Sequence, residues 1–189
     1  GYVGLEYPAD VSDPDILADF RIGLSFDEPE VKEKLAKALV YVALGDPDRL
    51  RHHISSLADH LDDDNALVRY HLTTALVAVG CDHPDRVSDI TAQLTERLTD
   101  ESPYVCGRSV EALGMLARSD TALDCDTDLD GIETPFEDAP EFLIDRLQFA
   151  RRVNTDEDQS TASEFGSIES IRTSIEDGAD GIRSPDSDD

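Results

Sequence analysis

Four acidic side chains near residue 130 have the spacing of a calcium-binding loop. Asp126, Asp128 and Asp130 alternate along the chain, Gly131 follows them, and Glu137 stands at the twelfth position of the loop. Alternate carboxylates converge on one cation, the glycine allows a sharp turn, and a late glutamate closes the cage of oxygen ligands. The spacing therefore predicts a candidate Ca²⁺ site formed by Asp126, Asp128, Asp130 and Glu137.

The same segment also fits a loop that binds no metal. The pattern resembles an EF-hand loop, but Glu133 stands where an aliphatic residue normally pairs with a second loop, and Pro135 follows two residues later. The chain contains one such loop, and its 29 aspartates raise the rate of chance matches. A solvated acidic loop is therefore the alternative interpretation, and these departures favour it.

Other combinations of reactive side chains carry weaker signals. Cys81, His83 and Cys125 have no recognised metal-ligand spacing and no fourth partner. The sequence contains no glycine-rich phosphate loop, no GxSxG nucleophile turn and no HExxH zinc motif. We therefore expect a protein that is not an enzyme and that needs no cofactor apart from calcium, should the acidic loop bind it.

The composition is strongly acidic, with a net charge of −27. Aspartates outnumber glutamates by 29 to 14, and three lysines stand against 13 arginines. This balance resembles that of proteins from halophiles with a potassium-rich cytoplasm, in which most surface acids serve solvation. So negative a surface disfavours binding to nucleic acid. Because there is neither an apolar run long enough for a membrane nor a signal pattern, we expect a cytoplasmic protein without membrane contact.

The helices around these acids follow a 37-residue period. Val31, Val68 and Val105 align three copies in which the apolar positions recur. A fixed period of this length indicates stacked units that are each too small to bury their own apolar face. Each unit contains two amphipathic helical patterns, and the first begins at Pro47 or Pro84. An acidic insertion at 119–139 and a closing helix at 140–152 follow the three pairs.

The repeated pattern resembles HEAT repeats, members of the armadillo-like α-solenoids. The residues that carry the resemblance best are Asp64, Val68, Arg69, Ala75, Leu76 and Gly80. The resemblance implies an all-α, right-handed α-solenoid of about three to four HEAT-like helix pairs in residues 1–152. It also implies a ladder of polar contacts between repeats, for which the candidate pairs are Asp27/Lys32, Asp64/Arg69 and Glu101/Cys106. Proteins of this family typically bind other proteins and act as scaffolds.

In this family the second helix of each pair lines a concave face. Helical spacing places mainly apolar or small residues on that face, together with one basic residue or histidine per repeat at its edge. The candidate partner-binding residues are Lys34, Val40, Tyr70, His71, Val77, Arg108 and Val110. An apolar groove with a cationic edge suits an acidic amphipathic helix of a partner. The alternative is that this face packs against the insertion or the closing helix.

The last 37 residues, 153–189, form an acidic tail with 11 acids and two arginines. Its composition predicts mostly disordered chain. Ile168, Ile171 and Ile175 nevertheless have helical spacing, which predicts a short helix at 163–177 with Ser163 as its cap. We hypothesise that this helix folds onto the groove, or onto a partner, as a detachable lid. The alternative is a free acidic tail that aids solubility.

Together these patterns predict a non-enzymatic protein-binding scaffold or adaptor with a concave helical surface. The alternative function is an accessory or regulatory subunit whose loop at 126–137 binds calcium. A third class, a HEAT-like lyase or nucleic-acid enzyme, is disfavoured because the sequence offers neither a basic groove nor a convergent acid–base set. The expected partner is a protein, and its candidate ligand is an acidic amphipathic helix or the chain's own tail.

Overall fold

The computed structural model describes residues 23–24, 28–119, 136–154 and 165–184. Throughout these ranges the regular secondary structure is helical, which confirms the all-α prediction for them. The α-helices are α3 (Pro29–Gly45), α4 (Ile54–Ala58), α5 (Ala66–Asp82), α6 (Pro84–Val87), α7 (Thr91–Glu96), α8 (Pro103–Arg118), α9 (Glu141–Asn154) and α10 (Ile168–Arg183). The short 3₁₀ helices are η2 (Pro47–Arg49), η3 (Ser88–Ile90) and η4 (Arg97–Thr99).

The second helix of each predicted pair begins at a local start signal in the sequence. Both α3 and α8 have a proline in their first turn, where the missing N–H costs no hydrogen bond. At the start of α5, the Asn65 side chain accepts a hydrogen bond of 2.9 Å from the backbone N–H of Leu67. Asp64 and Glu101, the acids of two predicted ladder pairs, stand one residue before the helix caps Asn65 and Ser102.

The first helix of each pair is less regular than its pattern predicts. The pattern after Pro47 forms η2 and α4, and the pattern after Pro84 forms four short helical pieces. Thr91 Oγ1 donates to the Ser88 carbonyl at 2.7 Å, and Thr95 Oγ1 donates to the Thr91 carbonyl at 2.8 Å. Such side-chain bonds to the preceding turn compete with regular helix geometry, so they favour breaks at these points.

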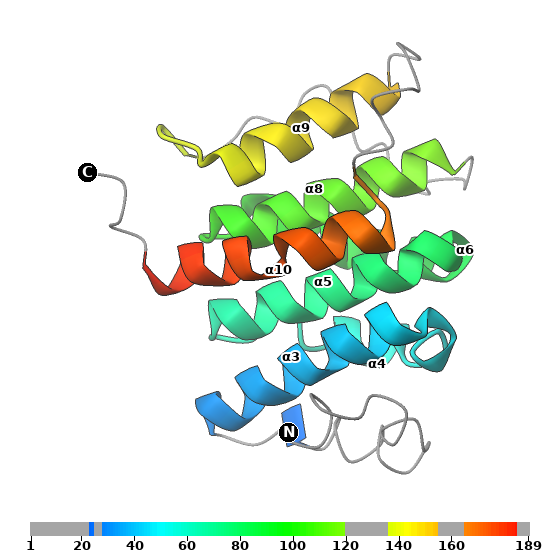
Figure 1. Ribbon diagram of the computed structural model, residues 1–189, viewed down its shortest axis with the longest axis vertical. Coiled ribbons are helices and arrows are strands. Elements are labelled where there is room, and N and C mark those ends of the chain that lie inside the picture. Colours follow the sequence, from blue (N-terminus) through cyan, green and yellow to red (C-terminus); the bar gives the residue numbers. More distant parts are fainter. Residues whose placement is uncertain (1–22, 25–27, 120–135, 155–164, 185–189) are drawn as a thin grey trace.

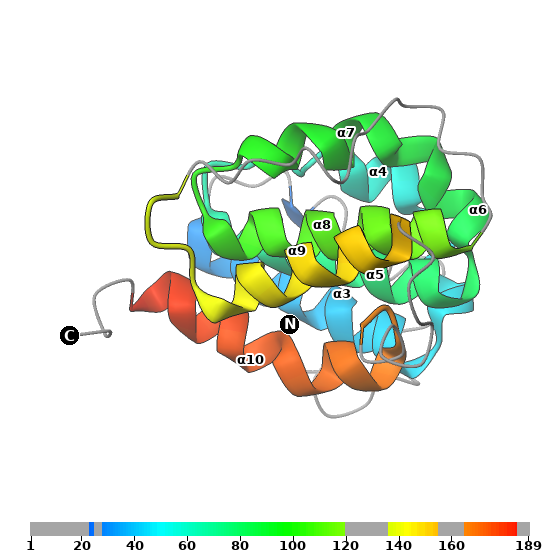
Figure 2. The same ribbon diagram turned by 90° about the horizontal axis from the view of Figure 1, so that it is seen from above.

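The long helices stack in chain order. Helices α3, α5, α8 and α9 lie side by side along the longest axis of the molecule (Figure 1). The short helices α4, α6 and α7 lie on one side of this stack, and α10 lies on the other (Figure 2). The main core fills the space between the stacked helices and includes the fully or almost fully buried residues Leu39, Leu57, Leu72, Leu76, Leu94 and Leu113. None of the helices described combines the length and apolar character needed to cross a bilayer.

The C-terminal helix is longer than predicted and begins later. It spans Ile168–Arg183 rather than 163–177, because Ser167 and Ser170 form a reciprocal capping box at its start. The predicted cap, Ser163, lies outside the described residues. Buried Ala179 extends the apolar face beyond Ile175. Residues 168–177 are therefore helical as predicted, and the helix continues to Arg183, where the composition predicted disordered chain. Helix α10 packs on α5 and α8.

Lys32 and Arg69 form ion pairs with the following repeat, but with partners other than those predicted; Arg69 also contacts the exposed Glu101 at 3.1 Å. Lys32 on α3 contacts Asp63, and Arg69 on α5 forms a two-pronged pair with Asp100, at 2.9 Å for each prong. Arg69 touches Asp64 only through the backbone carbonyl of that residue. At the third equivalent position the Cys106 thiol donates to the Leu98 carbonyl at 3.2 Å. The ladder therefore has two ionic rungs in the part of the chain described, and predicted Asp27 lies outside that part.

Candidate functional site

The predicted partner-binding face lies mostly inside the molecule. All of the candidate partner-binding residues are buried except Lys34, which is exposed. The buried members are Val40, Tyr70, His71, Val77, Arg108 and Val110. Helix α10 crosses this side of the stack and packs on α5 and α8 (Figures 1 and 2). We call the surface of α3, α5, α8 and α9 that contacts α10 the docking face.

Tyr70 is the central contact between the docking face and α10. Its hydroxyl donates to two carbonyl oxygens in the middle of α10, those of Ser174 at 3.1 Å and Ile175 at 3.0 Å. The same hydroxyl accepts a hydrogen bond of 3.1 Å from Arg108 Nη2. Because the tyrosine is fully buried, its ring adds apolar contact area while its hydroxyl fixes the position of α10 along the groove.

Below α10 lies a buried ionic group that we call the arginine cluster: Arg108 and Glu111 on α8, and Arg146 on α9. Glu111 Oε2 accepts from Arg108 Nη1 at 2.8 Å and from Arg146 Nε at 2.9 Å. Burial opposes ionisation of Glu111, but the two guanidinium charges hold the pKa of its carboxyl below the ordinary value. Burial and the nearby charge of Arg108 lower the pKa of Arg146, and together they exceed the opposing effect of the Glu111 carboxylate. The cluster therefore contains two cations and one anion.

The tail completes this cluster with neutral polar groups. Ser174 Oγ on α10 accepts from Arg108 Nη2 at 3.0 Å and from Arg146 Nη2 at 3.1 Å. The backbone N–H of Gly166 donates to Glu111 Oε1 at 3.3 Å. The guanidinium carbon of Arg146 lies 3.5 Å from the centre of the Phe142 ring, a cation–π contact that adds favourable interaction without adding charge.

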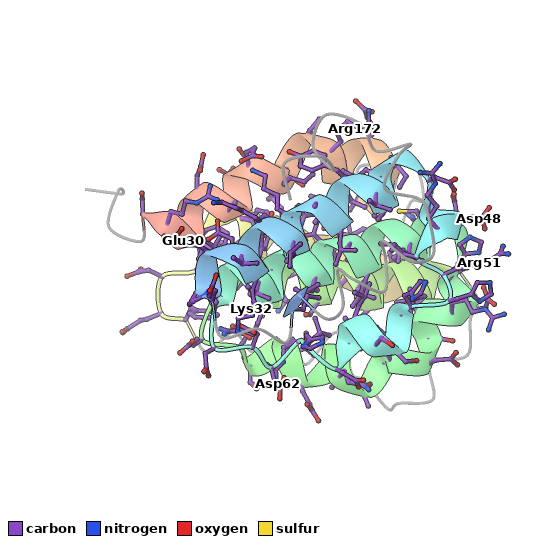
Figure 3. The ribbon with its side chains drawn as sticks, turned by 90° about the horizontal axis from the view of Figure 1, so that it is seen from below. Glu30, Lys32, Asp48, Arg51, Asp62 and Arg172 are labelled. Carbon is purple, nitrogen blue, oxygen red and sulfur yellow. The ribbon has the colours of Figure 1, made fainter. Side chains whose placement is uncertain are left out.

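Charged contacts also hold the rim of α10. Lys37 on α3 pairs with Glu176 at 2.8 Å, and Arg183 near the end of α10 pairs with Glu33 at 2.9 Å. The hydrogen bond and charge of Lys37 lower the pKa of Glu176. Figure 3 shows α10 beside α3, with Arg172 labelled on α10; its guanidinium donates to the Leu44 carbonyl at 3.4 Å. Because these rim groups are partly exposed, each pair contributes modestly to stability.

His71 does not supply the cationic edge that the sequence predicts. The ring is fully buried, and neither of its nitrogens has a hydrogen-bond partner within the described residues. Burial, with the nearby charges of Lys37 and Arg183, lowers the pKa of His71 to about 3. The imidazole is therefore neutral at pH 7. The cations that face α10 are Lys37, Arg108 and Arg146, of which the sequence singled out Arg108 alone.

The predicted calcium ligands fall mainly outside the structure's described part. Asp126, Asp128 and Asp130 lie in the segment that is not described, whereas Glu137 is exposed. Glu137 lines a groove of about 780 Å³ together with Glu101 and Asp138, beside the beginnings of α8 and α9. Within the described ranges, no three His, Cys, Asp or Glu side chains are arranged to hold a metal ion. The described residues therefore do not test the predicted calcium site, which stays a prediction.

The weaker candidate metal set is not assembled by the described residues. His83 Nε2 lies 2.9 Å from Asp48 Oδ1, and the Cys81 thiol lies against the Val77 carbonyl at 3.5 Å. Burial raises the pKa of the Cys81 thiol to about 12, which disfavours the thiolate that binds metals. The third member, Cys125, lies outside the described residues.

No protein-family model, no curated protein and no solved structure matches the chain. The function of the candidate site is therefore inferred from the contacts and charges described above. Sequence reasoning missed Glu111, Arg146 and Ser174, which make the polar centre of that site. One signal in the sequence was available for Glu111, because a glutamate stands in the apolar helix α8 where the preceding repeat has Thr74.

Proposed function

We propose that the chain is a non-enzymatic protein-binding scaffold built as a HEAT-like α-solenoid, whose docking face receives an amphipathic helix. In this proposal α10 occupies the face in cis and yields it to the helix of a protein partner. The observation that carries the proposal is the seating of α10 on the docking face through the Tyr70 hydroxyl.

The contacts of α10 resemble a reversible interface more than a domain core. Three residues on its apolar face, Ile171, Ile175 and Ala179, are buried. Ionic contacts with Lys37 and Glu33 surround them at partly exposed positions. Buried apolar side chains surrounded by partly exposed ion pairs are typical of surfaces that associate and separate. Intramolecular interfaces of this kind permit relative motion unless they are large and apolar.

The docking face also favours a partner helix with an acidic side. Lys37, Arg108 and Arg146 are the cations that meet α10, and Glu176 of α10 pairs with Lys37. A helix that carries an apolar stripe beside acidic residues matches both the apolar and the charged parts of this surface. We expect such a helix to contact the same side chains of the docking face as α10, including Tyr70, Lys37 and Arg108.

Hydrogen exchange on the full chain tests whether α10 opens separately. The expected result is that backbone amides in α10 exchange faster than those in α5, because α10 detaches while the stack remains folded. Equal exchange rates for α10 and α5 under all conditions would show that α10 is a permanent part of the core, which contradicts the proposal.

Binding in trans provides a second measurement. In the full chain, the double substitution Ile171→Asp and Ile175→Asp places charges on the buried side of α10 and should release it. A fluorescent peptide of residues 165–184 should then bind this variant saturably, whereas a peptide with the same two substitutions should not bind. Equal anisotropy changes for the two peptides would count against a specific groove.

A further inference from the structure

The arginine cluster holds an uncompensated positive charge beneath α10. Arg108 is fully buried and Arg146 is 3 % exposed, and Glu111 is the one carboxylate that contacts their guanidinium groups in the described structure. The acids of α10 lie elsewhere, because Glu176 pairs with Lys37 and Asp180 with Arg183. A buried charge without a counter-ion is costly, so this cluster is set to gain from one further negative charge.

Ser174 marks the place where that charge would act. Its hydroxyl oxygen is the acceptor shared by Arg108 Nη2 and Arg146 Nη2, and it donates its own proton to the Ser170 carbonyl at 2.8 Å. The hydroxyl thus has its hydrogen bonds satisfied but contributes no net charge. A carboxylate accepting the same two bonds forms charge-assisted hydrogen bonds, which are roughly twice as strong as neutral ones.

We propose that the preferred ligand of the docking face is a helix with an aspartate or glutamate at the position of Ser174. This inference rests on the proposed function. It implies that α10, which has Ser174 at this position, binds the docking face more weakly than the partner helix does. A single carboxylate brings the charge of the cluster from +1 to zero. A phosphate dianion would leave a buried charge of −1 beside Glu111, so charge balance favours the carboxylate over a phosphorylated side chain.

This arrangement lets a partner displace a tethered competitor. Being part of the same chain, α10 has a high effective concentration at the docking face, which an external helix must overcome by intrinsic affinity. The carboxylate at the position of Ser174 supplies the additional affinity that the partner helix needs. Any amphipathic helix can bury apolar side chains where Ile171 and Ile175 lie, and any helix can offer backbone carbonyls to the Tyr70 hydroxyl. The carboxylate is therefore the feature that distinguishes the partner helix from α10.

The test introduces the charge into α10 itself, in the full chain. Ser174→Asp adds a carboxylate between the two guanidinium groups, and Ser174→Asn adds a neutral side chain of nearly the same size. Thr173→Asp adds the same charge one residue earlier, on the exposed side of α10. Hydrogen exchange of the α10 amides is measured for all three variants and the parent.

We expect the protection of α10 in Ser174→Asp to exceed that in Ser174→Asn by at least about tenfold, or about 1.4 kcal/mol. Thr173→Asp should leave protection within about twofold of the parent. Equal protection in Ser174→Asp and Ser174→Asn, or an equal gain in Thr173→Asp, would overturn the inference. These outcomes are separate from the proposed function, which fails if α10 in the parent exchanges only together with α5.

Discussion

Tyr70 on α5 lies directly beneath Gly178 on α10. A Cβ atom added at Gly178 would lie 2.3 Å from the Tyr70 hydroxyl oxygen and 2.6 Å from Cε2 of its ring. Arg108 donates to that hydroxyl from within the core, so the tyrosine has little freedom to withdraw. The glycine therefore serves a close approach between two helices, at a position where helix propensity alone favours alanine.

Gly178→Ala should weaken the docking of α10 although it stabilises the isolated helix. Alanine favours helix by about 1 kcal/mol, but the clash with Tyr70 should cost about 1–3 kcal/mol. Hydrogen exchange should show faster exchange in α10 and unchanged exchange in α9. Thr173→Ala, at an exposed position on the same helix, is the control and should retain the parent's rates. Slower exchange in Gly178→Ala would contradict the observed approach.

Stability should fall below pH 6.5 because His71 is buried in its neutral form. Its pKa is about 3 in the folded protein and about 6.5 when unfolded, so the unfolded chain binds the proton first as the pH falls. The loss begins near pH 6.5 and continues towards pH 3, amounting to about 2 kcal/mol between pH 7 and pH 5. The charged groups that set this pKa include Lys37, Arg183, Glu176 and Arg108.

Denaturant titrations of the parent and of His71→Phe at pH 7 and pH 5 isolate this effect. The carboxylates titrate in both proteins, so the difference between the two pH dependences belongs to the histidine. The parent should lose about 2 kcal/mol more than the variant. Parallel losses would show that His71 is accessible to protons in the folded state.

The two rungs of the ladder should differ in their contribution to stability. Asp100→Asn removes the buried carboxylate from the buried Arg69 guanidinium and leaves the exposed Glu101 as its charged partner, which should cost about 3–5 kcal/mol in the free energy of unfolding. Asp63→Asn should cost less, about 1 kcal/mol, because the Lys32 side chain is 17 % exposed whereas that of Arg69 is 6 % exposed. Urea denaturation of both variants measures the difference, and equal losses would contradict it.

The Cys106 thiol should resist alkylation in the folded protein. Burial raises its pKa to about 12, so roughly one thiol in ten thousand is ionised at pH 8. We expect iodoacetamide to modify Cys106 only after unfolding, as measured by mass spectrometry of the peptide that contains it. Comparison with the same reaction in denaturant supplies the control. Rapid modification of the native protein would show that the end of the ladder opens.

The sequence predicted those features that depend on local periodicity. The stripes beginning at Val31, Val68 and Val105 predicted helices that the structure has as α3, α5 and α8, since burying an apolar face requires helical spacing whatever the partner surface. The short pieces after Pro84 were missed, because hydroxyl bonds such as that of Thr91 to Ser88 depend on rotamers that a hydrophobic pattern does not record.

Only the tertiary structure decided which surfaces meet. The stripe of Ile168, Ile171 and Ile175 predicted a helix and one apolar face, but any apolar surface would satisfy it. The place of α10 depends on contacts across more than 100 residues, including the Tyr70 hydroxyl on the Ile175 carbonyl. Likewise, the sequence pattern placed Arg108 on the candidate partner-binding face but did not connect Arg108 with Glu111 or Arg146. They become a cluster with a surplus charge because folding removes all three from water at one point.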